Sequence, residues 1–202
     1  MLDFLALSQS YNSLDELRYS PNESENGAWE DLNDLRRAKV IFGIHYSGVE
    51  TEPETLRFLL EQETLRAEND PFQGVGESLE TVAWLLSMHK APQDIPLFFR
   101  AKKANFDTHC GFDSEHIFSS GLDAVRTFLK SSTVANLCLE LRTLLGDEPF
   151  DQDELEEWAK YRANYMGRDW EKNRSPISPA ASKNSVSAKK PSSVWSLGRR
   201  VA

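Results

Sequence analysis

Apolar residues recur at every third or fourth position in several separate segments of this chain, which is the spacing of one face of an α-helix. The clearest stripe consists of Val134, Leu137, Cys138, Leu141, Leu144 and Leu145. The segment 40–46 is rich in residues that favour strands, but no second such segment is available to pair with it. The pattern therefore predicts an all-α fold, with 40–46 as helix or irregular loop.

The first 27 residues offer only a short apolar stripe, Leu14 and Leu17, and are expected to be loosely packed. Ser13 and Glu16 have the spacing of a capping box, and the segment 21–27 is a polar, turn-forming run. We expect a short helix followed by a loop. From Ala28 onward a helical stripe begins, and its apolar members are Trp29, Leu32, Leu35 and Phe42.

Capping signals mark the helices that follow. Thr51 lies three residues before Glu54 with a proline in the first turn, and an Asn-Asp-Pro run at 69–71 predicts the end of this helix. The segment 77–90 is apolar almost all round and is expected to be central. A four-residue break, in which Asp94 is placed to cap the next helix, predicts an antiparallel hairpin of 77–90 with 94–104.

The second half of the chain contains further start signals. The stretch 105–111 is expected to be irregular, and Asp113 is expected to cap a short helix that ends at Ser119 or Ser120. A stripe resumes at Leu122, and Asp151 with Glu154 has capping-box spacing for a last helix.

Two of these helices share a pattern: the segment 79–86 (Leu-Glu-x-Val-x-x-x-Leu) is repeated conservatively at 122–129, 43 residues later. The segment 82–99, an apolar helix, a short polar turn with Asp and then Ile-Pro-x-Leu, resembles the helical hairpin of HEAT repeats over about 25 residues. The resemblance implies a short HEAT-like solenoid. Because Leu97 falls on Glu140 at the same offset, an irregular helical bundle is the alternative.

The charge is unevenly distributed along the chain. Residues 171–202 carry +6 and residues 1–170 carry −15, which together make the net charge of −9. The last segment is rich in Ser and Pro and has few residues to bury, so we expect a disordered basic tail at 171–202 after a helical domain at 28–170.

Composition excludes several classes of protein. No stretch approaches the roughly 20 apolar residues of a membrane span, and the acidic start lacks the positive charge of a signal peptide, so a cytoplasmic protein without a membrane partner is expected. Two cysteines cannot form a disulfide framework. An acidic body repels phosphates, which makes nucleic acid an improbable partner for it. No phosphate-binding loop, HExxH or GxSxG motif occurs, so no cofactor is expected.

The segment 107–116 is the most reactive by composition, and its candidate residues are Asp107, His109, Cys110, Asp113 and His116. Asp113 and His116 are three residues apart and would share a helix face. Such a set suits a divalent metal or a thiol and base pair, although its spacing matches no standard zinc pattern. A metal-dependent or thiol enzyme is therefore one alternative function.

The leading hypothesis is a non-catalytic, adaptor-like interaction protein whose acidic surface binds a protein with a basic surface. In the tail, Trp195, Leu197, Arg199 and Arg200 form a candidate docking motif, because Trp and Arg dominate interface energies. An acidic inhibitor or immunity-type protein for a basic partner is a further alternative.

Overall fold

The computed structural model describes residues 3–23, 29–70, 74–131, 139–143 and 151–167. It separates one compact unit, Met1–Gly167, from Arg168–Ala202. Helices make up most of the described residues, which confirms the predicted all-α fold. The elements in chain order are α1 (Phe4–Ser8), η1 (Leu14–Leu17), β1 (Pro21–Glu23), β2 (Trp29–Asp31), α2 (Asp34–Ser47), α3 (Pro53–Asn69), α4 (Glu77–Ser87), η2 (Pro92–Asp94), α5 (Ile95–Lys103), α6 (Phe106–Gly111), η3 (Ser114–Phe118), α7 (Leu122–Ser131) and α9 (Gln152–Met166).

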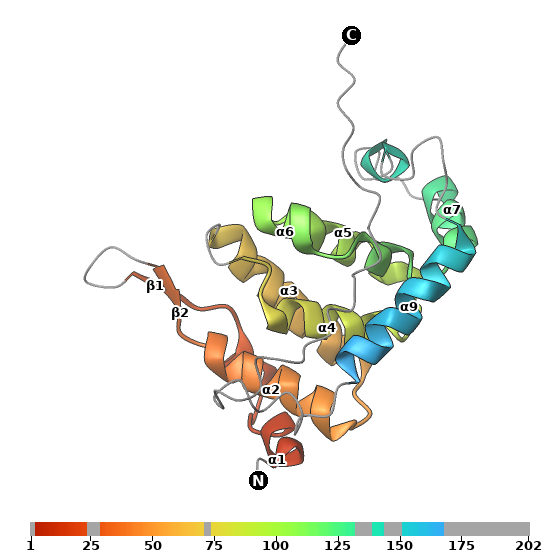
Figure 1. Cartoon of the computed structure of the whole chain (residues 1–202). Coiled ribbons are helices and arrows are strands. Elements are labelled where there is room, and N and C mark those ends of the chain that lie inside the picture. Colours follow the sequence, from red (N-terminus) through yellow and green to blue (C-terminus); the bar gives the residue numbers. More distant parts are fainter. Residues whose placement is uncertain (1–2, 24–28, 71–73, 132–138, 144–150, 168–202) are drawn as a thin grey trace, which may run out of the picture. The chain divides into compact units, whose positions relative to one another are not determined.

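The long helix α3 organises the core. It packs against α4 on one side and α5 on another, while α2 packs against α1 and α4 (Figure 1). Leu59, Leu60, Leu79, Val82 and Leu86 are fully or almost fully buried where α3 meets α4. α4 is therefore central, as its all-round apolar sequence predicts.

Several predicted helix boundaries are confirmed. Pro53 lies in the first turn of α3, and that helix ends at Asn69. The Asp151 side chain accepts a hydrogen bond from the Asp153 N–H, and the Glu154 carboxylate accepts one from the Asp151 N–H, so the capping box of α9 is formed. These are local signals, and local chemistry is sufficient to place them.

The prediction that a helical stripe begins at Ala28 is wrong. Residues 29–31 form β2, which pairs antiparallel with β1 in the register Pro21 to Asp31. Helix α2 starts at Asp34 and buries Arg37, Val40, Ile41 and Ile44, whereas Leu32 and Leu35 are 64% and 67% exposed. The segment 40–46 is helical, which is one of the two structures predicted for it, helix or irregular loop.

The first residues are packed more closely than predicted. Leu17 is fully buried in the core, and α1 packs on α2. Gly43 allows this contact, because a Cβ at that position would lie 2.4 Å from the Ser8 backbone nitrogen. The segment 4–17 is thus part of the folded unit.

Several predictions of helix caps and boundaries differ from the structure. The N-cap of α3 is Glu52 and not Thr51, with no side-chain capping hydrogen bond, and Ser13 makes no capping hydrogen bond to η1. The Asp94 side chain does not cap α5; it forms an ion pair with Arg57, Nε to Oδ1, at 2.6 Å. The stretch 105–111 is not irregular: it is α6, held by a capping box between Asn105 and Thr108. The Asp113 side chain makes no capping hydrogen bond to η3. Asp94 and Asp113 each bind a side chain that is distant in sequence and not the backbone of the helix that follows.

Further predictions concern the repeated pattern and the stripe at 134–145, and part of that stripe lies outside the described residues. The helices α4 and α7 form where the repeated pattern lies. α5 packs mainly against α3 and η3 and not against α4, its predicted partner in the hairpin of 77–90 with 94–104. Of the stripe at 134–145, Leu141 is described and is fully buried, while Cys138 lies outside the described residues. No helix in the described ranges has the length and apolar composition needed to cross a bilayer.

Candidate functional site

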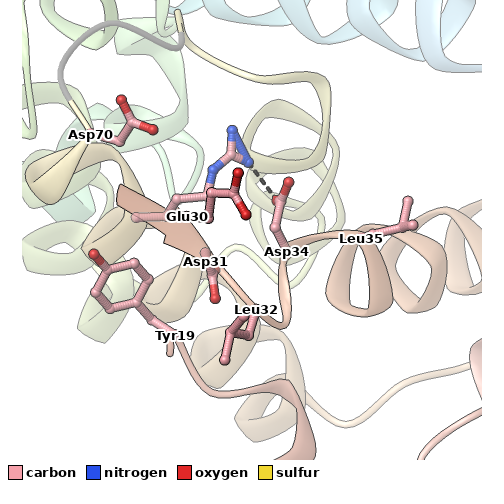
Figure 2. A pocket seen from close by; sticks show the side chains of 8 residues that line it. Tyr19, Glu30, Asp31, Leu32, Asp34, Leu35 and Asp70 are labelled. Atoms are coloured by element: carbon pink, nitrogen blue, oxygen red, sulfur yellow. Dashed lines mark hydrogen bonds and ion pairs between the residues drawn. The ribbon is translucent and has the colours of Figure 1, made fainter. Parts of the chain in front are cut away.

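A pocket of about 250 Å³ opens where β2 runs into α2, beside the end of α3 (Figure 2). Carboxylates dominate its wall. The lining residues are Tyr19, Glu30, Asp31, Leu32, Asp34, Leu35, Arg66 and Asp70. Three chain segments that are far apart in sequence therefore meet at one acidic hollow.

The floor of the pocket is fixed by Asp31. Its Oδ1 accepts hydrogen bonds from the backbone N–H groups of Ser20 and Asn33 at 3.0 and 3.1 Å. Its Oδ2 pairs with Arg37 Nη2 at 2.7 Å. A carboxylate held by two backbone donors and one guanidinium cannot reorient, so β2 and the start of α2 are held at a fixed angle.

Arg37 lies beneath the pocket and is fully buried. Its Nε donates to Glu63 Oε1 at 2.6 Å and its Nη1 donates to the Leu17 carbonyl at 3.3 Å. The other Glu63 oxygen accepts from the Ser78 hydroxyl at 2.6 Å. Burial lowers the pKa of Arg37, but Glu63 and Asp31 raise it by more, so that its pKa lies above the usual value. The guanidinium thus stays charged and fully paired.

The upper wall is more negative than the floor. Asp34 Oδ1 pairs with Arg66 Nη1 at 2.7 Å, the ion pair drawn as a dashed line in Figure 2. Among the described residues, no hydrogen bond or ion pair engages the carboxylates of Glu30 and Asp70. With four acids and Arg66 in its lining, the pocket carries a formal charge of −3.

Tyr19 and two leucines complete the site. Burial, and then the charges of Asp31 and Asp70, raise the pKa of Tyr19 above its usual value, so its phenol stays protonated at neutral pH. Leu32 and Leu35 line the pocket and are largely exposed. The site therefore combines carboxylates with apolar surface, which is the combination that receives a long side chain with a cationic end.

The predicted candidates in the segment 107–116 are distributed over different environments. Asp107 Oδ2 accepts a hydrogen bond from the Gly74 N–H at 3.1 Å, which ties α6 to the loop before α4. His109 and Cys110 are exposed on α6. The structure does not bring these three residues to one catalytic cavity.

Asp113 and His116 do lie together, but with different neighbours. Asp113 Oδ2 accepts a hydrogen bond from Trp158 Nε1 at 3.1 Å, and the same oxygen lies 3.5 Å from Arg162 Nη1. His116 is fully buried, with Nε2 3.9 Å from Glu80 Oε2. Within the described ranges, no group of three His, Cys, Asp or Glu side chains is arranged to hold a metal ion.

Sequence reasoning missed the acidic pocket. Glu30, Asp31 and Asp34 alternate with the two exposed leucines, and this run was interpreted as one side of a helix. The available signal was the density of acids in that run, but Asp70 joins them only through the fold. The candidate tail motif, Trp195, Leu197, Arg199 and Arg200, lies outside the described residues.

Comparisons of this chain with protein-family models, with curated proteins and with solved structures found no match.

Proposed function

We propose that this chain is a non-catalytic interaction protein that binds a partner protein through the acidic pocket at β2, α2 and α3. The occupant is a lysine or arginine side chain that stands next to apolar residues of the partner. The observation that carries this proposal is the pocket's lining: four carboxylates against one arginine, with Leu32 and Leu35 exposed beside them.

The charges in and below the pocket support a cationic occupant. Arg37 and Arg66 neutralise part of the acidic set, but Glu30 and Asp70 have no described partner for their carboxylates. A guanidinium or ammonium placed between them would form charge-assisted hydrogen bonds, which are the strong class. The apolar neighbours of that cation would cover Leu32 and Leu35, which removes exposed apolar area from water.

Pre-organisation supports the same conclusion. Asp31 is held by Ser20, Asn33 and Arg37, so this carboxylate loses little freedom when a ligand binds. Binding to an ordered surface retains more of the interaction energy than binding to a mobile one.

The test is an NMR titration of the full chain with two peptides, acetyl-Leu-Arg-Leu-amide and acetyl-Leu-Gln-Leu-amide. We expect shifts at residues 30–35 and 66–70 with the arginine peptide, and weaker shifts at higher salt. The double variant Glu30→Gln/Asp70→Asn should lose this response. A matched control, Asp153→Asn/Glu157→Gln, removes two exposed acids from α9 and should retain it. Equal binding of the glutamine peptide, or an unchanged response in the pocket variant, would contradict the proposal.

A further inference from the structure

Helix α9 is attached to the rest of the folded unit by a few polar contacts and by limited apolar packing, in which Leu155 joins the core and Trp158 meets Trp84. Within its described length, Leu155 and Arg162 are its only buried residues. Trp158 donates to Asp113, Arg162 pairs with Glu80, and His45 Nε2 lies 2.8 Å from the Met166 carbonyl oxygen. A helix held in this way has little of the apolar burial that normally stabilises a packed helix.

A pocket that is partly open to solvent lies at the edge of the α9 interface. It has a volume of about 140 Å³ between α4, η3 and α9, and Trp84, Phe118, Leu155 and Trp158 are among its lining residues. Side chains that line such a pocket lack dispersion contacts on that side. The free energy that holds α9 closed is thus expected to be smaller than the free energy of unfolding of the whole unit.

Beneath α9 lies His116, a buried imidazole with an unsatisfied polar edge. Its ring stacks on Phe98 at 5.8 Å between centroids and meets Trp158 edge-on at 5.0 Å. Within the described part of the chain, neither ring nitrogen has a hydrogen-bond partner. An imidazole in water satisfies both nitrogens, so closure of α9 over His116 is opposed by the loss of those bonds.

The charges around His116 come from several elements, and they do not act in one direction. Glu80 belongs to α4, Asp113 and Glu115 are at η3, Lys102 is on α5 and Arg162 is on α9. Asp113 and Glu115 favour the protonated imidazole, but burial opposes it more strongly and lowers the pKa of His116 to about 4. The closed structure therefore excludes a proton that a hydrated His116 would take up near neutral pH.

We propose that α9 is a latch that opens on acidification, because opening hydrates His116 and lets it bind a proton. Trp158 leaves the imidazole when the helix lifts, and the ion pair of Arg162 with Glu80 is broken at the same time. The two states differ in the proton bound at His116, so lower pH favours the open one. This device is separate from the acidic pocket and does not rest on the function proposed for it.

The size of the effect follows from linkage. If His116 titrates near 6.5 when hydrated and near 4 when covered, opening is about 30-fold more favourable at pH 5 than at pH 7.5. His45 also has a lowered pKa, caused by burial, and its exposure at the end of α9 would act in the same direction.

Amide hydrogen exchange of the full chain, measured by mass spectrometry at pH 7.5 and pH 5 and corrected for intrinsic exchange rates, tests the latch. We expect the protection of α9 to be lower than that of α3 at both pH values and to fall about 30-fold at pH 5. Unchanged protection of α9, or α9 amides as protected as those of α3 at both pH values, would overturn the proposal. The second outcome would show that α9 opens only when the whole unit unfolds.

Variants assign the effect to His116. His116→Phe keeps a ring among Phe98, Phe112 and Trp158 but cannot bind a proton, so its α9 should show nearly the same protection at both pH values. His109→Gln removes an exposed histidine and should keep the wild-type response. Leu155→Ala should lower protection at both pH values by the same factor. A full pH response in His116→Phe would overturn the proposal.

An NMR titration of the wild-type imidazoles keeps the test independent of that variant's folding. The latch requires the His116 resonance to show the neutral form at pH 5 in molecules whose α9 amides are protected. A protonated His116 in the closed state at that pH would equally overturn it.

Discussion

Gly43 on α2 lies directly against the backbone of Ser8 on α1, and a Cβ on Gly43 would stand 2.4 Å from the Ser8 nitrogen and 2.8 Å from the Leu7 carbonyl carbon. Backbone atoms of a helix cannot yield as a flexible side chain can. Gly43→Ala should therefore displace α1 and lower the free energy of unfolding by about 1–3 kcal/mol. Urea denaturation measures this loss.

Deleting residues 1–9 provides the control for this substitution. In the shortened chain the obstacle is gone, and Gly43→Ala should raise stability by up to about 1 kcal/mol, because alanine favours helix over glycine. A loss of the same size in both backgrounds would show that the contact with α1 is not the cause.

Arg37 and its neighbour Arg36 differ in burial by enough to predict stability losses of very different size. Arg37→Met leaves Asp31 and Glu63 inside the protein without their cation, so we expect a loss of about 3–5 kcal/mol. Arg36 pairs with Glu16 at the surface, with 52% of its side chain exposed, and Arg36→Met should change stability by less than about 1 kcal/mol. Denaturant unfolding of the two variants at neutral pH makes the comparison. Equal effects would mean that the buried network does not matter.

Global stability should depend on pH through His116. The pKa of this group is lowered to about 4 in the folded protein, so the unfolded chain binds its proton first as the pH falls. The stability that depends on a neutral His116 is fully present above about pH 6.5. It is lost as the pH falls from about 6.5 to about 4, and about 3 kcal/mol of unfolding free energy is lost in all. The unfolding free energy of the wild type should therefore fall relative to that of His116→Phe over this range, whichever of the two is more stable at pH 7.5. A constant difference from pH 7.5 to pH 4.5 would contradict it.

Cys110 provides a test of the thiol-enzyme alternative. It is exposed, and its neighbour His109 is exposed as well. Cys110→Ser should change the free energy of unfolding by no more than about 0.5 kcal/mol, as is usual for a surface substitution. It should also leave binding at the acidic pocket unchanged in the peptide titration. A large loss of binding with unchanged stability would show that Cys110 takes part in function.

Local signals in the sequence predicted a large part of the fold. A proline in the first turn sets the start of α3, and the Asp151 capping box sets the start of α9, because each depends on residues within one helical turn. The failures have the opposite origin. Asp94 has the sequence context of a cap, but Arg57, 37 residues away, binds its carboxylate.

The acidic pocket was beyond prediction for the same reason. Leu32 and Leu35 fit a helical stripe, yet the buried face of α2 begins with Arg37 and leaves both leucines exposed. A hydrophobic pattern places an arginine at the surface. The ion pairs of Arg37 with Glu63 and Asp31 offset the free-energy cost of burying its charge. The leucines were displaced to the surface by an ion pair that spans 26 residues, which no periodicity encodes.

The Arg37 network also determines how the folded unit responds to a cut in the chain. In the sequence, Arg37 precedes the loop between α2 and α3, and Glu63 follows it. Ser78 on α4 donates a hydrogen bond to the same Glu63. A cut in that loop separates a cation from its anion, so each fragment alone would have to hydrate a charge that the intact protein buries. The two pieces should therefore be poorly folded when produced separately and should recover structure when mixed.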